Sequence, residues 1–244
     1  MSRLIREDLN FTKEFISEYS LKSCIDNHEY VRILSQNHKK YFAFLLFLSE
    51  LENTGFKSIK ISLKLNNENY YNFRNYLKEC VSDLGCAFFN WIQGDYKSSR
   101  LLIRSSVEDF VKSMASVEDN GICEIKSVYE VFERASTLDI FSSEINAGIL
   151  TNLKNTYSIL CRDVHTANYD NMQQISAMEY FPAFEAEKAN QTSKYFIEVS
   201  KEMLSLLSLS FKDVYVKMHP GNLDIINPVL IKVVKHEIYA PSET

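Results

Sequence analysis

Residues 68–115 decide the fold class; they read ENYYNFRNYLKECVSDLGCAFFNWIQGDYKSSRLLIRSSVEDFVKSMA. Apolar residues recur at three- and four-residue intervals on both sides of Gly94-Asp95, which is the spacing of an amphipathic helix. The glycine interrupts the pattern, as glycine does where a helix ends. The stretch therefore predicts one helix over 68–93 and another over 96–115, joined as a tight antiparallel hairpin.

The same periodicity extends outward in both directions from this hairpin. Stop signals are expected at Thr54-Gly55 and at Pro220-Gly221-Asn222. Further helices are predicted within residues 1–28 and over 29–53, 124–134, 144 to about 165, and 185–218. The fold class that follows is all-α, an antiparallel helical bundle with at most one or two short strands.

One segment has the pattern of a β-strand. In Ser58–Leu65 apolar and polar residues alternate strictly. A strand needs a partner for its backbone groups, and Val229–Tyr239 or a second chain is expected to supply it. We expect a single domain comprising N-terminal helices and a strand in 1–67, a bundle in 68–218 and a C-terminal helix or strand extension in 219–244.

Composition excludes several classes of protein. The 244 residues are 45% hydrophobic, with 14 Tyr and 16 Phe, as in a packed globule, and the 6 Gly and 4 Pro favour long helices. The formal net charge of -5 argues against a general polyanion-binding surface. Five cysteines without a CxxC pair favour reduced thiols, and no apolar run is long enough for a membrane span. We expect a cytoplasmic protein that needs no metal or cofactor and does not bind membranes.

Arg104 is the first candidate site residue. It falls inside the apolar stripe of the helix over 96–115, where an unpaired charge is costly. Glu108 lies one turn away and has the spacing to pair with it. Two interpretations remain open: a structural salt bridge between helices, or a polar cleft that binds a ligand.

The helix ending near His165 is the second candidate. Tyr157 belongs to its apolar face, and His165 lies at the edge of that face. A histidine at a rim reaches solvent and titrates near neutral pH, which suits general acid–base catalysis. The alternative is a histidine that stabilises the negative end of the helix dipole.

These residues together resemble the HEPN superfamily, and in particular its divergent bacterial members. The resemblance covers about residues 68–218 and is carried by Gly94-Asp95-Tyr96, by Arg100, Arg104 and Glu108, and by the segment 157–165, YSILCRDVH. It implies a helical bundle that forms a homodimer. It also implies either a metal-independent RNase of antiviral defence or toxin–antitoxin systems, with RNA as substrate, or an inactive binding module.

Active members carry an arginine and a histidine with four to six residues between them, whereas Arg162 and His165 have only two residues between them. The resemblance implies that His165 transfers a proton and that Arg104, with Arg162, stabilises the charge on the phosphorus centre. Glu108 would position Arg104, and Tyr157 would contact a phosphate or orient the histidine.

A second hypothesis comes from a different class of protein. The shortened arginine–histidine interval and the acidic balance favour a non-catalytic helical module that scaffolds or regulates a partner protein, such as an antitoxin. This hypothesis predicts a polar cluster sealed inside the bundle and a large apolar surface elsewhere.

Overall fold

The computed structural model describes residues 2–18, 22–163 and 181–240, which form helices joined by turns and loops, with no β-strand among them. The long helices are α3 (His28–Glu50), α5 (Asn67–Gln93), α6 (Tyr96–Ala115), α8 (Glu144–Leu160) and α9 (Ala186–Ser210). The shorter α-helices are α1 (Arg3–Glu18), α2 (Lys22–Ile25), α4 (Phe56–Ser62), α7 (Val128–Ala135), α10 (Lys212–Tyr215), α11 (Pro220–Ile226) and α12 (Lys232–Tyr239). The prediction of an all-α fold is confirmed.

The predicted hairpin is present as α5 and α6. Gly94 ends α5 with a left-handed backbone, φ +89°, which glycine adopts without steric cost. The side chain of Asp95 then caps α6 by accepting a hydrogen bond from the amide of Ser98 at 3.2 Å. The turn is also held from outside, because the amide of Ala183 donates to the carbonyl of Gln93 at 3.1 Å.

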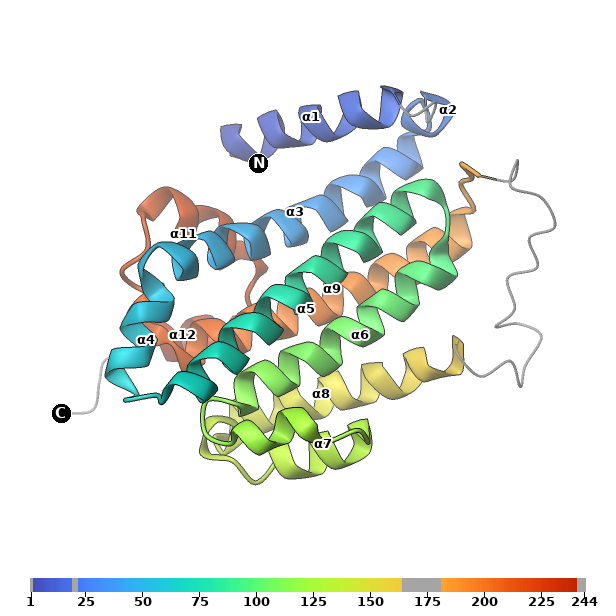
Figure 1. The fold of residues 1–244 in the computed structure, drawn as a ribbon. Helices are drawn as coiled ribbons and strands as arrows, with labels where there is room; N and C mark the ends of the chain where they lie inside the picture. Colours follow the sequence, from blue (N-terminus) through green and yellow to red (C-terminus); the bar gives the residue numbers. More distant parts are fainter. Residues whose placement is uncertain (1, 19–21, 164–180, 241–244) are drawn as a thin grey trace.

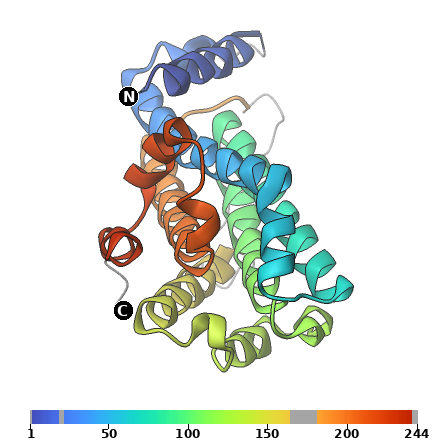
Figure 2. The same ribbon diagram turned by 90° about the vertical axis from the view of Figure 1, so that its left-hand side faces the viewer.

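The long helices pack side by side around this hairpin (Figure 1). Helix α9 contacts α3, α6 and α8, while α1 crosses over α3 on the outside of the bundle. Seen after a quarter turn, the C-terminal helices lie against one side of the bundle (Figure 2). The carboxyl-terminal part of α8 and the amino-terminal half of α6 are thereby neighbours.

Aromatic rings fill the end of the core beneath the hairpin turn. The Trp91 ring stacks on Tyr30 at a centroid distance of 5.2 Å, and Tyr96 packs edge-on against it at 6.4 Å. The Trp91 indole donates to the carbonyl of Ala189 at 3.0 Å, so the buried N–H is satisfied. One hydrophobic cluster runs from Ile5 in α1 to Ile238 in α12.

The predicted strand over Ser58–Leu65 is wrong. Residues 56–62 form α4, because Phe56 and Ile59 at helical spacing are buried while Ile61 and Leu63 remain exposed. Phe56 packs edge-on against Phe73 of α5 at 5.4 Å.

The expected partner strand over Val229–Tyr239 is helical as well. It consists of a short 3-10 turn followed by α12, whose Val234 and Ile238 are buried one turn apart. In both segments a helix buries one apolar stripe and satisfies its own backbone hydrogen bonds. A strand with the alternating pattern would leave its backbone groups unsatisfied unless a second strand paired with it.

Two predicted stop signals do not act as stops. Thr54-Gly55 lies in a π-helical turn, Leu51–Gly55, through which α3 continues into α4, and Gly55 keeps a right-handed helical backbone. A β-carbon on Gly55 would approach Val214 of α10 to 3.0 Å, so the glycine allows close packing. The long C-terminal helix ends at Ser210, and Pro220 occupies the first turn of α11 instead of terminating a helix.

The remaining boundaries shift by a few residues or fall partly outside the described chain. The helix predicted over 124–134 is α7, preceded by a 3-10 turn at Asn120–Glu124. The helix predicted from 144 is α8 followed by a 3-10 turn at Cys161–Asp163.

Nothing in the part of the chain that the structure describes forms a helix long and apolar enough to cross a membrane.

Candidate functional site

Arg104 links α6 to the end of α8. Its Nε donates a hydrogen bond to the Sγ of Cys161 at 3.2 Å, and its Nη2 donates to the hydroxyl of Tyr157 at 2.5 Å. The guanidinium carbon also lies 4.7 Å from the centre of the Tyr157 ring. Arg104 is half-buried, so the charge that the sequence places in an apolar stripe is held at the rim of the core.

Tyr157 is fixed on its other side by Phe132 of α7, whose ring packs edge-on at 5.8 Å. Burial raises the pKa of Tyr157 to about 12, although the charge of Arg104 opposes that rise. The phenol therefore keeps its proton at neutral pH. Its oxygen accepts from Arg104, and a side-chain hydrogen bond with Cys161 adds to the rise of the pKa.

Glu108 is held by a different partner from the one expected. Its Oε1 forms an ion pair with Lys112 at 2.9 Å, one turn further along α6. Arg104 and Lys112 each lie four residues from Glu108. The pair with Lys112 is the more favourable one, because on a helix a carboxylate that precedes the cation is the better order. Glu108 acts on Arg104 only through its charge, and Arg104 is positioned by Tyr157 and Cys161.

Asp109 completes an acidic neighbourhood beside this pair. Burial, and then the charges of Asp83, Glu108 and Glu79, raise the pKa of Asp109 to about 7. These carboxylates come from α5 and α6. Among the described residues, no three His, Cys, Asp or Glu side chains are arranged to hold a metal ion.

The remaining predicted site residues lie at or beyond the end of α8. Arg162 is exposed in the 3-10 turn Cys161–Asp163 that follows α8. His165 lies outside the described residues, two positions after Asp163 in the sequence. Arg100, one turn before Arg104, donates to the hydroxyl of Thr192 in α9 at 3.2 Å. The structure thus brings Arg104 and Tyr157 into contact and pairs Glu108 elsewhere.

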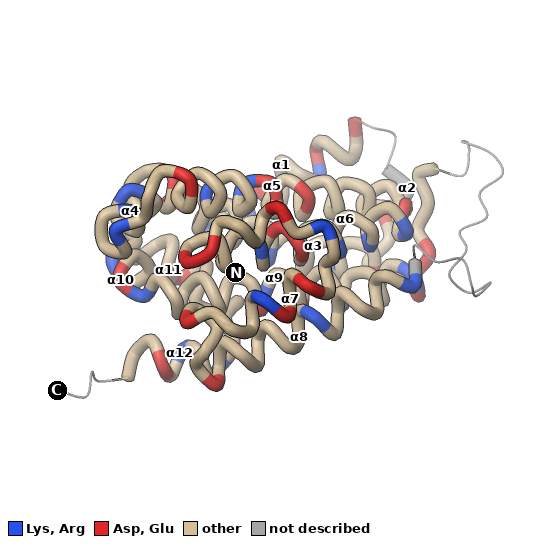
Figure 3. The backbone as a smooth tube through the Cα atoms, turned by 60° about the horizontal axis from the view of Figure 1, so that its bottom comes forward, with Lys and Arg blue, Asp and Glu red and all other residues tan. Residues whose placement is uncertain are grey.

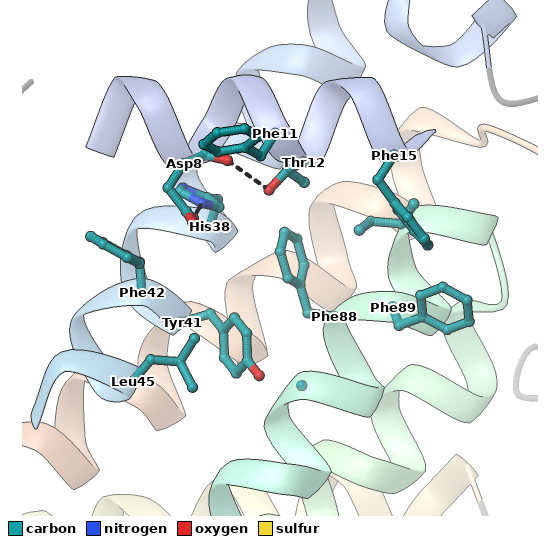
Figure 4. A pocket seen from close by; sticks show the side chains of 12 residues that line it. Asp8, Phe11, Thr12, Phe15, His38, Tyr41, Phe42, Leu45, Phe88 and Phe89 are labelled. Carbon is teal, nitrogen blue, oxygen red and sulfur yellow. Dashed lines mark hydrogen bonds and ion pairs between the residues drawn. The ribbon is translucent and has the colours of Figure 1, made fainter. Parts of the chain in front are cut away.

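A groove lies between α1 and the bundle, away from the Arg104 cluster (Figure 4). This groove has a volume of about 390 Å³ and contains side chains from α1, α3 and α5. Its aromatic lining residues are Phe11, Phe15, Tyr41, Phe42, Phe88 and Phe89.

One end of this groove is polar. There the buried His38 is hydrogen-bonded through Nε2 to the carboxylate of Asp8. On the opposite wall Gly85 makes room for Tyr41, because a β-carbon on Gly85 would come within 2.5 Å of the Tyr41 hydroxyl.

Comparisons with known proteins add no relative: no family model, no curated protein and no solved structure matches the chain. The class that fold and site define is an all-α bundle with a cationic, hydroxyl-bearing cluster between two of its helices. Membership of the HEPN superfamily stays a prediction.

Two contacts of the cluster were not predicted from the sequence. Cys161 appears in the sequence only as part of the segment 157–165, yet its sulfur accepts the Arg104 hydrogen bond. The second contact is the ion pair of Glu108 with Lys112, whose i, i+4 spacing and favourable order are present in the sequence. No sequence signal indicated the Cys161 contact, because it depends on how α8 meets α6.

Proposed function

We propose that this protein is an HEPN-like, metal-independent endoribonuclease of an antiviral defence or toxin–antitoxin system, acting as a homodimer. The observation that supports the proposal is the Arg104 cluster. It presents a permanent cation and a protonated phenol together near the end of α8, and its residue Cys161 precedes His165 by four positions in the sequence. A guanidinium and a phenolic O–H are suitable donors to phosphate oxygens.

The reaction that suits these groups is transesterification within the RNA strand. His165 accepts the proton of a 2′-hydroxyl, and the 2′-oxygen forms a bond to phosphorus while the bond to the 5′-oxygen breaks. The leaving 5′-oxygen takes up a proton, which gives a 2′,3′-cyclic phosphate and a 5′-hydroxyl. Arg104 stabilises the charge that develops on the phosphorus centre. Tyr157 holds the guanidinium and donates to a phosphate oxygen.

The test is RNA cleavage in EDTA by wild type, His165→Ala and Arg104→Gln. Matched controls are His236→Ala and Arg134→Gln, which change a histidine of α12 and an arginine paired with Asp119. We expect cyclic-phosphate ends from wild type and both controls, and loss of about a hundredfold or more in rate for the two site variants. Equal cleavage by wild type and His165→Ala would remove the catalytic assignment.

The aromatic groove favours a second candidate function, a non-catalytic module that binds a regulatory partner protein. Phe11 is 69% exposed and Phe89 is 38% exposed at its edge, so apolar surface is open to a partner. The product of a neighbouring gene, co-expressed with the chain, would co-elute in gel filtration with wild type but not with the double variant Phe11→Ser, Phe89→Ser. A lone dimer that cleaves RNA and retains no partner would reject this alternative.

A further inference from the structure

Four lysines gather where α3, α9 and α12 meet. They are Lys39 and Lys40 of α3, Lys201 of α9 and Lys235 of α12, and all four are half-buried. Within the part of the chain that the structure describes, none of these side chains forms an ion pair or a hydrogen bond. Burial disfavours an ammonium ion, and no ion-paired carboxylate among the described residues offsets that cost for these four lysines.

Hydrogen bonds between the helices establish that these lysines belong to one junction. The hydroxyl of Ser193 donates to the side-chain oxygen of Asn37 at 2.6 Å, which fixes α9 against α3 less than a turn before Lys40. The amide of Ile231 donates to the hydroxyl of Ser205 at 2.9 Å, which fixes the start of α12 against α9. Ser205 follows Lys201 by one turn.

Lys235 follows Ile231 by one turn of α12, and its amide donates to the Ile231 carbonyl at 3.1 Å. The lysine of α12 therefore extends from the face that meets α9 near Lys201. The C-terminal helices lie along the same side of the bundle in Figure 2.

The charges that act on the Lys40 ammonium group are of one sign. Burial, followed by the charges of Lys39, Lys201 and Lys235, lowers the pKa of Lys40 to about 8. The nearest carboxylate in sequence, Glu202, interacts with the charge of Lys201 and accepts a hydrogen bond from Asn152 of α8 at 3.1 Å, but it does not act on Lys40. Figure 3 shows acidic and basic residues interspersed over the helices, as expected for a chain with 32 acidic and 27 basic residues.

An arrangement of like charges in a partly desolvated junction destabilises the free protein. An anion that binds there would remove the repulsion, and several anionic oxygens would be needed to serve several ammonium groups. From this juxtaposition we infer that Lys39, Lys40, Lys201 and Lys235 form a binding site for a compact, multiply charged phosphate anion. This inference does not depend on the proposed nuclease function, since the Arg104 cluster lies between α6 and α8.

The convergence of the lysines favours a compact anion over a nucleic-acid strand. A strand distributes its charges along a path, and the proteins that bind it align cations along a groove. Here three helices bring their lysines to the surroundings of Lys40. A short polyphosphate presents its charges within that span.

Inorganic triphosphate is a suitable probe, with binding measured by calorimetry and by thermal denaturation. We expect triphosphate to raise the Tm of the wild type. Lys235→Gln should raise the Tm of the free protein, because a repulsive charge is removed. Lys201→Gln and Lys235→Gln should each weaken triphosphate binding by about tenfold. The matched control is Lys57→Gln, which removes an exposed lysine of α4 and should leave both properties unchanged.

Three results would overturn the inference: no triphosphate binding to the wild type at millimolar concentration, equal affinity in wild type and variants, or a loss of RNA binding without any loss of triphosphate binding. Arg104→Gln serves to separate the two proposals. It should bind triphosphate as the wild type does, whatever its effect on RNA cleavage.

Discussion

Gly94 satisfies two requirements at the residue scale. Its backbone is left-handed, and a β-carbon at this position would lie 2.2 Å from the carbonyl oxygen of Ala183. We predict that Gly94→Ala lowers the free energy of unfolding by about 2–3 kcal/mol, since strain and overlap add. Urea denaturation checks the value.

The matched control is Gly148→Ala on the exposed side of α8, where a β-carbon meets no atom within 4 Å. There alanine favours the helix, and a gain of up to about 1 kcal/mol is expected. Similar losses at both positions would contradict the role assigned to Gly94.

Asp109 makes stability depend on pH. Its pKa is about 7 in the folded protein against an ordinary 3.8, so the folded state binds this proton more tightly than the unfolded state does. Stability therefore falls as the pH rises from about 4 to 7 and then levels. We predict that Asp109→Asn is more stable than wild type at pH 8 by about 1 kcal/mol, a figure reduced for solvent screening, and that the gain shrinks toward pH 4.

Thermal denaturation across this pH range tests the sign. The exposed Asp224→Asn serves as control and should leave the pH dependence as it is in the wild type. A gain for Asp109→Asn that grows as the pH falls would show that the carboxylate is stabilised by its surroundings, contrary to the effect described above.

At the scale of elements, the Arg104–Tyr157 contact joins α6 to α8. A double-mutant cycle with Arg104→Met and Tyr157→Phe should give a coupling energy of about 1 kcal/mol, because the hydrogen bond disappears while the ring and its contact with Phe132 remain. Urea denaturation of the four proteins provides the measurement. Additive effects would mean that the hydrogen bond contributes nothing to the joining of these helices.

The sequence predicted the helices with strong periodicity and both ends of the α5–α6 hairpin. Gly94 ends a helix by its left-handed backbone, so the stop was visible locally. Gly55 and Pro220 are also residue types that often end helices, but neither ends one here. Gly55 allows close packing against Val214, and Pro220 occupies the first turn of α11. Those tasks depend on neighbours that are distant in sequence.

The candidate site was predictable to a similar extent. Arg104 stands out because a charge interrupts an apolar stripe, and Tyr157 was named with it. Which groups hold the guanidinium follows from the crossing of α6 and α8, which helical spacing alone does not define. The same limit explains the lysine cluster, whose members come from three helices.

At the scale of the whole molecule, a single hydrophobic cluster connects the helices from α1 to α12. The chain has one tryptophan, and Trp91 is 1% exposed between Tyr30 and Tyr96. We predict that unfolding followed by Trp91 fluorescence coincides with unfolding followed by far-ultraviolet circular dichroism. Two separate midpoints would indicate that part of the bundle unfolds independently.

The π-helical turn at Leu51–Gly55 marks a place where the chain tolerates the deletion of one residue. Such a turn holds one residue more than an α-helical turn, and the residues of the helix beyond it point in the same directions as they would without the extra residue. Losing the exposed Asn53 would convert the turn into regular α-helix and leave Phe56 directed at Phe73. A loss in the middle of α3 would instead rotate every later residue by about 100° and turn its apolar stripe toward water.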